Sequence, residues 1–244
     1  MEPLLSERRV RRIRHELKLR TLQVLRVERE HPALARVVLQ GDELADFVSL
    51  SFDDHVKLFL PDGQGAEVRR DYTPRAFDAG RRELVIEFAL HGDGPATRWA
   101  RQAQPGQTLR VGGPRGSMVI DDDLDWLLLA GDACALPAIR RRVAELPADA
   151  AVRVIALVDD PTELALPPTA AALEQRVCLQ RDAWLAALAE WVPPRGEGFA
   201  WCAGEAALMA RARATLRLKG VSAASMRVAA YWKRGQADFH DTLA

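Results

Sequence analysis

The sequence predicts a two-domain protein of the β + α/β class, in which an N-terminal antiparallel β-barrel precedes a C-terminal α/β domain with a parallel sheet. The chain has 244 residues, enough for two compact domains, and its pattern changes near residue 122. Before that point, short alternating segments recur between turn signals; after it, apolar runs alternate with helical segments. We therefore expect domains at residues 1–122 and 123–244.

The N-terminal half contains segments that alternate between apolar and polar residues, as half-buried strands do. The turn signals PDGQG (61–65), DAG (78–80) and QPGQ (104–107) separate them, which is typical of an antiparallel barrel. One helix is expected at 95–103, where Pro95 can occupy the first turn. The strands are expected at 16–27, 35–40, 55–60, 83–90 and 107–112.

The C-terminal half alternates strands with helices. Residues 126–130 (WLLLA) and 152–158 (VRVIALV) are predominantly apolar, as strands buried on both faces are. Such alternation indicates a parallel sheet whose ligands bind at the carboxyl ends of its strands. The other strands are expected at 176–179, 198–204 and 225–232, and the helices at 135–146, 182–191 and 205–219.

Composition excludes several classes of function. Lysine and arginine number 34, as do aspartate and glutamate, so no net charge favours nucleic acid or an anionic membrane. Cys134, Cys178 and Cys202 lack metal-ligand spacing and are expected to be reduced core residues, with no bound metal. Without a membrane-spanning run or a signal peptide, we expect a cytoplasmic protein that does not insert into a membrane. We also expect a monomer. The arginine-rich residues 1–20 leave a nucleic-acid arm open as an alternative to a solvated lead-in.

The segment RRDYTPRAF (69–77), expected on a barrel strand, places an aromatic ring, a hydroxyl and positive charge within four residues. The Tyr72 ring offers a stacking face for a planar cofactor, and the Thr73 hydroxyl can hydrogen-bond its edge. Arg70 precedes Tyr72 by two residues and so points to the same side of a strand, where its guanidinium suits a phosphate. An ordinary strand with an edge tyrosine is the alternative.

The segment HGDGPATRWA (91–100) leads two glycines and a proline into a helix. The first N–H groups of that helix lack intrahelical partners and attract phosphate oxygens. Ala96, Thr97 and Arg98 are therefore candidates for a second pyrophosphate contact. His91 is a candidate cofactor contact, with a structural role as the alternative, and Trp99 is expected in the core.

The segment AGDACALPAI (130–139) has the strand–turn–helix order of a dinucleotide site. It lacks the GxGxxG fingerprint, so a tight connection in which Asp132 caps the helix is the alternative. Cys134 is expected to be a packed side chain and not a catalytic thiol.

Together these motifs resemble those of the siderophore-interacting protein family, flavin-dependent ferric-siderophore reductases built on the ferredoxin-reductase plan. The resemblance covers nearly the whole chain. Its marks are FDDHVKLFLP (52–61), RDYTP (70–74), HGDGPATRWARQAQPG (91–106), GGPRGS (112–117), AGDACALPAIRR (130–141), WCAGE (201–205) and AAYWKRG (229–235). Three residues depart from the family: Glu87 stands where aspartate is frequent, and Ala133–Cys134 replaces a Glu–Thr pair.

The resemblance implies that the barrel binds FAD and that the α/β domain binds NADPH or NADH. Arg70 would contact the pyrophosphate, Tyr72 would stack on the isoalloxazine and Thr73 would bond near its N5, which makes Tyr72 and Thr73 the catalytic candidates. The further cofactor contacts implied are His91, Ala96, Thr97, Gly131, Asp132, Gly204, Glu205, Tyr231 and Trp232. The basic candidates for the substrate, a ferric siderophore, are Lys57, Arg115, Lys233 and Arg234, each with a solvated surface charge as the alternative.

The expected function is that of an NAD(P)H-dependent ferric-siderophore reductase, an oxidoreductase. Hydride carries two electrons and Fe(III) accepts one, and a flavin can exchange electrons with both. Fe(II) is held less tightly than Fe(III) by catecholate or hydroxamate oxygens, so reduction releases the iron. Two alternatives stay open: a non-catalytic flavin- or siderophore-binding protein, and a flavin electron-transfer module for a protein partner.

Two features of the sequence give opposite indications of whether the cofactor is NADPH or NADH. The compact ending after YWKRG resembles family members that use NADPH, whereas those that prefer NADH tend to carry a C-terminal helical extension. However, Asp159 and Asp160 follow the second α/β strand, where an acid can bond the ribose 2′-OH and repel a 2′-phosphate. The arginines at 140–142 offset these acids or form an exposed helix face. We expect NADPH.

Overall fold

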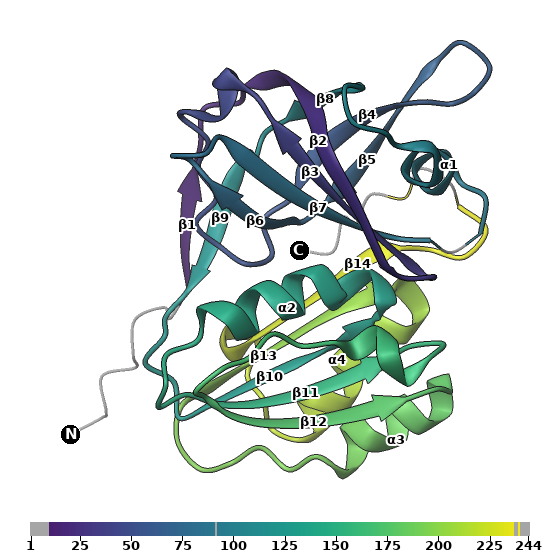
Figure 1. Ribbon diagram of the computed structural model, residues 1–244. Coiled ribbons are helices and arrows are strands. Elements are labelled where there is room, and N and C mark those ends of the chain that lie inside the picture. The colour runs from purple at the N-terminus through teal and green to yellow at the C-terminus, as the bar shows by residue number, and fades with distance from the viewer. Residues whose placement is uncertain (1–9, 91, 237–238, 240–244) are drawn as a thin grey trace. The chain divides into compact units, whose positions relative to one another are not determined.

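The computed structural model describes residues 10–90, 92–236 and 239. The chain divides into two compact units, one of Arg12–Val119 and the other containing the residues from Ile120 onward. Each unit has its own hydrophobic core. Figure 1 shows the first as a curled sheet and the second as a sheet flanked by helices.

The first unit is an antiparallel sheet of seven strands in the order β5-β4-β8-β2-β3-β7-β6, counted over the described residues. The helix α1 (Pro95–Gln102) packs against it. The strands are β2 (Leu19–His31), β3 (Leu34–Gln40), β4 (Val56–Pro61), β5 (Glu67–Tyr72), β6 (Pro74–Asp78), β7 (Glu83–Ala89) and β8 (Thr108–Gly112). A short 3-10 helix, η1, spans Asp42–Leu44.

This strand order makes β5 and β6 the two edges of the sheet, although only Thr73 separates them along the chain. Consecutive Cα atoms lie about 3.8 Å apart, so the sheet must curl until its edges meet at this residue. The segment expected on one barrel strand is therefore two strands, and Thr73 lies at the seam of a half-barrel. We call this place the seam.

The second unit is a parallel sheet of five strands in the order β12-β11-β10-β13-β14, again over the described residues. Figure 1 shows α2 on one face of this sheet and α3 and α4 on the other. The strands are β10 (Trp126–Asp132), β11 (Ala151–Leu157), β12 (Ala172–Cys178), β13 (Gly198–Glu205) and β14 (Met226–Trp232). The helices are α2 (Leu136–Glu145), α3 (Arg181–Glu190) and α4 (Ala206–Leu218), with 3-10 turns η2 (Ala133–Ala135), η3 (Pro161–Leu164) and η4 (Ala223–Ser225).

The chain builds this sheet outward from β10 in one direction and then returns to add β13 and β14 on the other side. The point where the order reverses lies between β10 and β13, and in sheets of this kind ligands bind beyond the carboxyl ends of the strands there. Every residue of β10 and β13 is buried, as their apolar sequences predict.

All the expected helices and strands are present with shifted ends, but β1 (Val10–Arg14) and β9 (Gly116–Ile120) were not expected. They form a two-stranded sheet. The sequence of β1, VRRIR, carries more charge than a typical strand. Gly116 permits the pairing, because a Cβ at that position would fall on the carbonyl oxygen of Ile13.

Candidate functional site

Arg70 and Tyr72 point to the same side of β5, as their spacing predicts. In the β4–β5 ladder Arg70 pairs with Leu58 and Tyr72 with Val56, and both partners are fully buried. Paired residues share a face of the sheet, so Arg70 and Tyr72 lie on the core side. Thr73, which follows at the seam, is also buried.

The Tyr72 ring packs against a row of aromatic rings from β7 and α1. Its centroid lies 4.5 Å from that of Phe88, whose centroid lies 5.5 Å from that of Trp99. Phe88 is fully buried and Trp99 packs against the same core, as expected. Tyr72 itself is half-buried, so the core fixes a ring that stays partly accessible.

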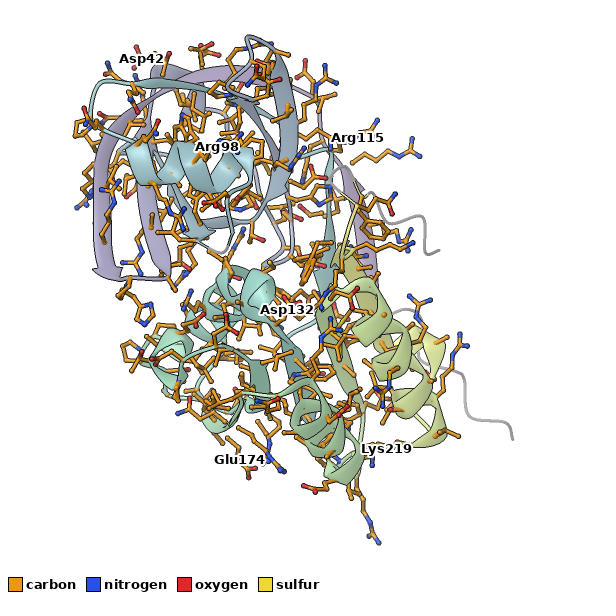
Figure 2. All side chains as sticks on the ribbon, turned by 90° about the vertical axis from the view of Figure 1, so that its right-hand side faces the viewer. Asp42, Arg98, Arg115, Asp132, Glu174 and Lys219 are labelled. Atoms are coloured by element: carbon orange, nitrogen blue, oxygen red, sulfur yellow. The ribbon has the colours of Figure 1, made fainter. Side chains whose placement is uncertain are left out.

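The N-terminus of α1 begins with Gly94 as the N-cap, and no side chain caps it. A Cβ on Gly94 would meet no atom within 4 Å, so the space before the helix is open. Ala96 and Thr97 form its first turn, and Thr97 is buried. Arg98, labelled on α1 in Figure 2, donates to the carbonyl oxygens of Asp62 and Asp93. His91 lies outside the described residues.

These groups fit a planar cofactor that carries a pyrophosphate. The seam supplies a fixed ring face, a hydroxyl and a guanidinium, and α1 supplies an open, glycine-led helix N-terminus. All of them belong to the first unit.

Lys57 does not join Tyr72 on its face of the sheet, and Arg115 lies outside the seven-stranded sheet. Lys57 pairs with Asp71 in the ladder, on the side of β4 opposite to Val56, and its Nζ lies 2.8 Å from the Asp71 Oδ1. Arg115 is exposed in the turn between β8 and β9. The positive charge of Lys57 is therefore partly neutralised before any ligand binds.

Two residues to which the sequence analysis gave no role anchor the Arg115 turn. The Ser117 hydroxyl donates to the Asp54 Oδ2 at 2.6 Å and lies 2.7 Å from the His15 Nε2. Burial raises the pKa of the Asp54 carboxyl, although the hydrogen bonds from Ser117, Ser51 and Ser49 favour its ionised form. Both anchors lie within the family motifs quoted above, but only the fold brings them together.

Glu87 is fully buried and forms ion pairs beside the seam. Its Oε1 lies 3.1 Å from an Arg36 nitrogen and 3.7 Å from the Arg75 Nε. Arg75 is the extra residue of a bulge in the β6–β7 ladder, between Pro74 and Ala76. Bulges re-aim side chains, and this one directs Arg75 towards Glu87.

Gly131 and Gly204 bring the ends of β10 and β13 close together. A Cβ on Gly131 would fall on the Ala203 carbonyl oxygen and 2.5 Å from the Ala135 Cβ. Gly204 has a φ of +152°, and a Cβ there would lie 2.6 Å from the Asp132 Oδ2. Only glycine permits both approaches.

Asp132 lies at the end of β10 (Figure 2) and receives three N–H groups. Its Oδ1 accepts from the Cys134 backbone at 3.0 Å, and its Oδ2 accepts from the Glu205 backbone at 2.8 Å and from the Trp232 Nε1 at 2.9 Å. It therefore caps the turn that leads into α2, which is the alternative that the sequence left open. Burial raises the pKa of Asp132, whereas these hydrogen bonds favour the carboxylate.

Glu205 caps α4 and pairs with α3. Its Oε2 accepts from the Leu208 backbone at 3.1 Å and lies 2.7 Å from an Arg181 nitrogen. Burial opposes ionisation, but the Arg181 pair and the backbone hydrogen bonds lower the pKa of Glu205 below its usual range. Tyr231 meets Trp201 edge to face, and Lys233 and Arg234 are exposed beyond β14.

One expectation and one alternative about the second unit are wrong. Cys134 is exposed rather than packed, because Ala135 takes the place against the sheet, whereas Cys178 and Cys202 are buried as expected. The arginines at 140–142 are buried and form no exposed helix face. Arg140 donates to the Glu163 and Ala165 carbonyl oxygens, and Arg142 pairs with Asp122 at 2.8 Å.

Asp160 also has a structural role, since it caps η3 in a capping box with Glu163. Over residues 10–90, 92–236 and 239, no helix is long and apolar enough to cross a membrane. Over the same residues, no group of three or more His, Cys, Asp or Glu could hold a metal ion.

A curled antiparallel half-barrel followed by a parallel sheet with a reversal point fits a two-domain fold in which one domain binds FAD and the other binds a nicotinamide dinucleotide. Residues 23–118 match the siderophore-interacting FAD-binding domain, in two overlapping segments, and residues 124–235 match the siderophore-interacting protein model. The chain belongs to the siderophore-interacting protein family.

Individual relatives are similar to this chain over most of its length. The NADPH-dependent ferric-chelate reductase of Escherichia coli K12 is 34% identical over 243 residues, which cover 91% of this chain and 95% of the relative. The crystal structure of a siderophore utilization protein from T. fusca is 36% identical with a TM-score of 0.86 and covers 95% of this chain and 98% of its own. That of the siderophore-interacting protein SipS from Aeromonas hydrophila is 27% identical with a TM-score of 0.77, covering 92% and 93%.

Proposed function

We propose that this protein is an NAD(P)H-dependent ferric-siderophore reductase that uses FAD. The observation that carries the proposal is the group of Arg70, Tyr72 and Thr73 at the seam: Arg70 and the anchored Tyr72 ring share the core side of β5, and the buried Thr73 follows directly. The match to an FAD-binding domain supports the cofactor, and the relative named as an NADPH-dependent ferric-chelate reductase supports the reaction.

Three residues at the seam hold the flavin. The Tyr72 ring supplies the stacking face, the Thr73 hydroxyl bonds the edge of the ring system, and Arg70 binds the pyrophosphate together with the N-terminus of α1. Bound FAD supplies the exchange between a two-electron hydride donor and a one-electron acceptor. Glu87 holds Arg75 beside the seam and so supports the residues around it.

The nicotinamide nucleotide binds at the reversal point between β10 and β13. Gly131 and Gly204 let the ends of β10 and β13 lie close together at this edge, and Lys233 and Arg234 add positive charge beyond β14. Iron enters as the substrate. Its reduction weakens its bonds to hard siderophore oxygens and releases it.

The test is an anaerobic titration of FAD-loaded protein with NADPH and NADH, followed by a ferric siderophore, with the flavin absorbance recorded. A reductase loses its flavin absorbance on addition of nucleotide and regains it on addition of ferric siderophore. A non-catalytic binding protein shows no nucleotide-dependent bleaching. An electron-transfer module bleaches but is not reoxidised by ferric siderophores.

Arg115→Ala is expected to raise the KM for an anionic ferric catecholate about fivefold, as the loss of one exposed charge contact of about 1 kcal/mol would. Lys57→Ala should have a smaller effect, because Asp71 already neutralises part of its charge. Steady-state kinetics with a neutral ferric hydroxamate, together with an FAD titration, provide the control. Equal losses for both substrates would contradict the electrostatic argument.

NADPH is expected to reduce the bound FAD faster than NADH. The Asp160 carboxylate already accepts from the Thr162 backbone at 2.8 Å, so capping competes with any contact to a ribose. Stopped-flow reduction with each nucleotide measures the preference. An advantage for NADH that Asp159→Arg or Asp160→Arg reverses would show instead that the acidic pair decides.

A further inference from the structure

A bulge at the end of β14 sets the direction of Trp232. In the β13–β14 ladder Gly204 pairs with Ala230 and Glu205 pairs with Trp232, so Tyr231 is an extra residue. An extra residue exchanges the faces of the side chains that follow it. The Trp232 indole consequently reaches Asp132, 100 residues earlier in the chain, where its Nε1 donates to the Oδ2 at 2.9 Å.

This hydrogen bond passes over the strand that separates its partners. The sheet order is β10-β13-β14, so the bond from β14 to β10 crosses the end of β13 at Gly204. A Cβ on Gly204 would lie 2.6 Å from the same Asp132 oxygen. The missing side chain of Gly204 is therefore what leaves room for the carboxylate to join all three strands.

The Asp132 carboxylate is suited to hold protein groups rather than a nucleotide. Both of its oxygens already accept from protein N–H groups, and the residue is 7% exposed. A carboxylate also repels the phosphates of a nucleotide. Its effect on a ligand must therefore pass through the groups that it holds.

We propose that Asp132 is a positioning residue of the nicotinamide site, and that it acts through Trp232. Its carboxylate fixes the carboxyl ends of β10, β13 and β14 in one arrangement and sets the indole at the edge where a nicotinamide dinucleotide binds. The inference rests on the proposed function. A site held in its bound arrangement before binding loses less entropy when the ligand arrives.

The experiment is a double-mutant cycle with Asp132→Asn and Trp232→Phe, in which the Kd for NADP⁺ is measured calorimetrically on FAD-loaded protein. An asparagine turns an N–H group towards at least one of the three donors, and a phenylalanine removes the indole N–H donor. Each single variant is expected to raise the Kd about tenfold. The double variant should raise it no further, because both changes act on the same link between Asp132 and Trp232. The Trp232 emission, obtained as the difference from Trp232→Phe, should shift in wavelength when Asp132 is replaced.

Asp125→Asn is the matched control. The Asp125 Oδ2 accepts from the Glu197 backbone at 2.7 Å and so joins the amino ends of β10 and β13, at the opposite edge of the same sheet. This variant should leave the Kd for NADP⁺ unchanged.

Three results would overturn the inference alone: a lower melting temperature with an unchanged Kd for Asp132→Asn, additive losses in the double variant, or an equal loss for Asp125→Asn. If Asp132→Asn does not fold, Trp232→Phe decides, and an unchanged Kd counts against the inference. Wild-type protein that binds neither NADP⁺ nor NAD⁺ would overturn the proposed function and the positioning role with it.

Discussion

Arg70→Ala is expected to weaken FAD binding about ten- to a hundredfold, and Tyr72→Ala to weaken it about tenfold or more. A charge-assisted hydrogen bond contributes about 1.5–3 kcal/mol, and each 1.4 kcal/mol is about tenfold in affinity. Wild-type protein should purify yellow or take up added FAD, whereas the variants should lose flavin during purification. Flavin fluorescence, titrated against protein concentration, measures each Kd.

Arg69→Ala is the control for this result. Arg69 neighbours Arg70 on β5 but faces the other side, where its guanidinium lies 5.3 Å from the centroid of the Phe59 ring. The Arg69→Ala variant should bind FAD like the wild type. Tyr72→Phe keeps the stacking face, so its affinity for FAD should fall only slightly. If folded wild-type protein bound no FAD, the proposed function would be wrong. If Arg69→Ala weakened FAD binding as much as Arg70→Ala, the effect would come from the loss of any positive charge on β5 and not from a specific contact of Arg70.

The second large effect is expected at Gly131. Gly131→Ala should lower the free energy of unfolding by about 3 kcal/mol or more, at the top of the usual range for overpacking. The added Cβ would fall on the Ala203 carbonyl oxygen, which cannot move away without disturbing the β10–β13 ladder, and 2.5 Å from the Ala135 Cβ. Denaturant unfolding followed by circular dichroism measures the change.

Gly80→Ala provides the comparison, since a Cβ there would meet only the Asp78 Oδ1, at 3.3 Å. Its free energy of unfolding should stay within about 1 kcal/mol of the wild type. An unchanged midpoint of denaturant unfolding for Gly131→Ala would mean that β10 and β13 can move apart without a loss of stability. That result would contradict the close approach described above.

The central strands could be predicted because their signal is local. A continuous apolar run such as WLLLA identifies a strand buried on both faces, and β10 is such a strand. The division of 69–77 into β5 and β6 could not be predicted in the same way. Neither strand has a clear apolar face, and both are defined by ladders with residues distant in the chain, such as Val56 and Ile86.

The candidate site also has features that the local sequence predicts and features that it does not. The shared side of Arg70 and Tyr72 follows from a two-residue spacing. The ion pair that neutralises Lys57 depends on how β4 and β5 are aligned, and the bond from Asp132 to Trp232 depends on a bulge; neither leaves a mark in the local sequence.

Buried charge was the most misleading signal. Three consecutive arginines at 140–142 have the composition of a solvated helix face, and the structure buries all three. Carbonyl oxygens of the β11–β12 connection accept from Arg140, and Asp122 pairs with Arg142. Main-chain acceptors have no sequence signature, so such burial becomes visible only in the folded chain.

The seam also constrains how the length of this chain can vary. Thr73 alone joins the two edges of the sheet, so an inserted or deleted residue there would shift β5 against β4 or β6 against β7 and turn a row of side chains to the wrong face. The connection between β4 and β5, residues 62–66, is mostly exposed and bears no such constraint. Doubling the length of a flexible loop costs only about 0.6 kcal/mol. Homologous chains should therefore differ freely in length at the β4–β5 turn and keep a single residue between β5 and β6.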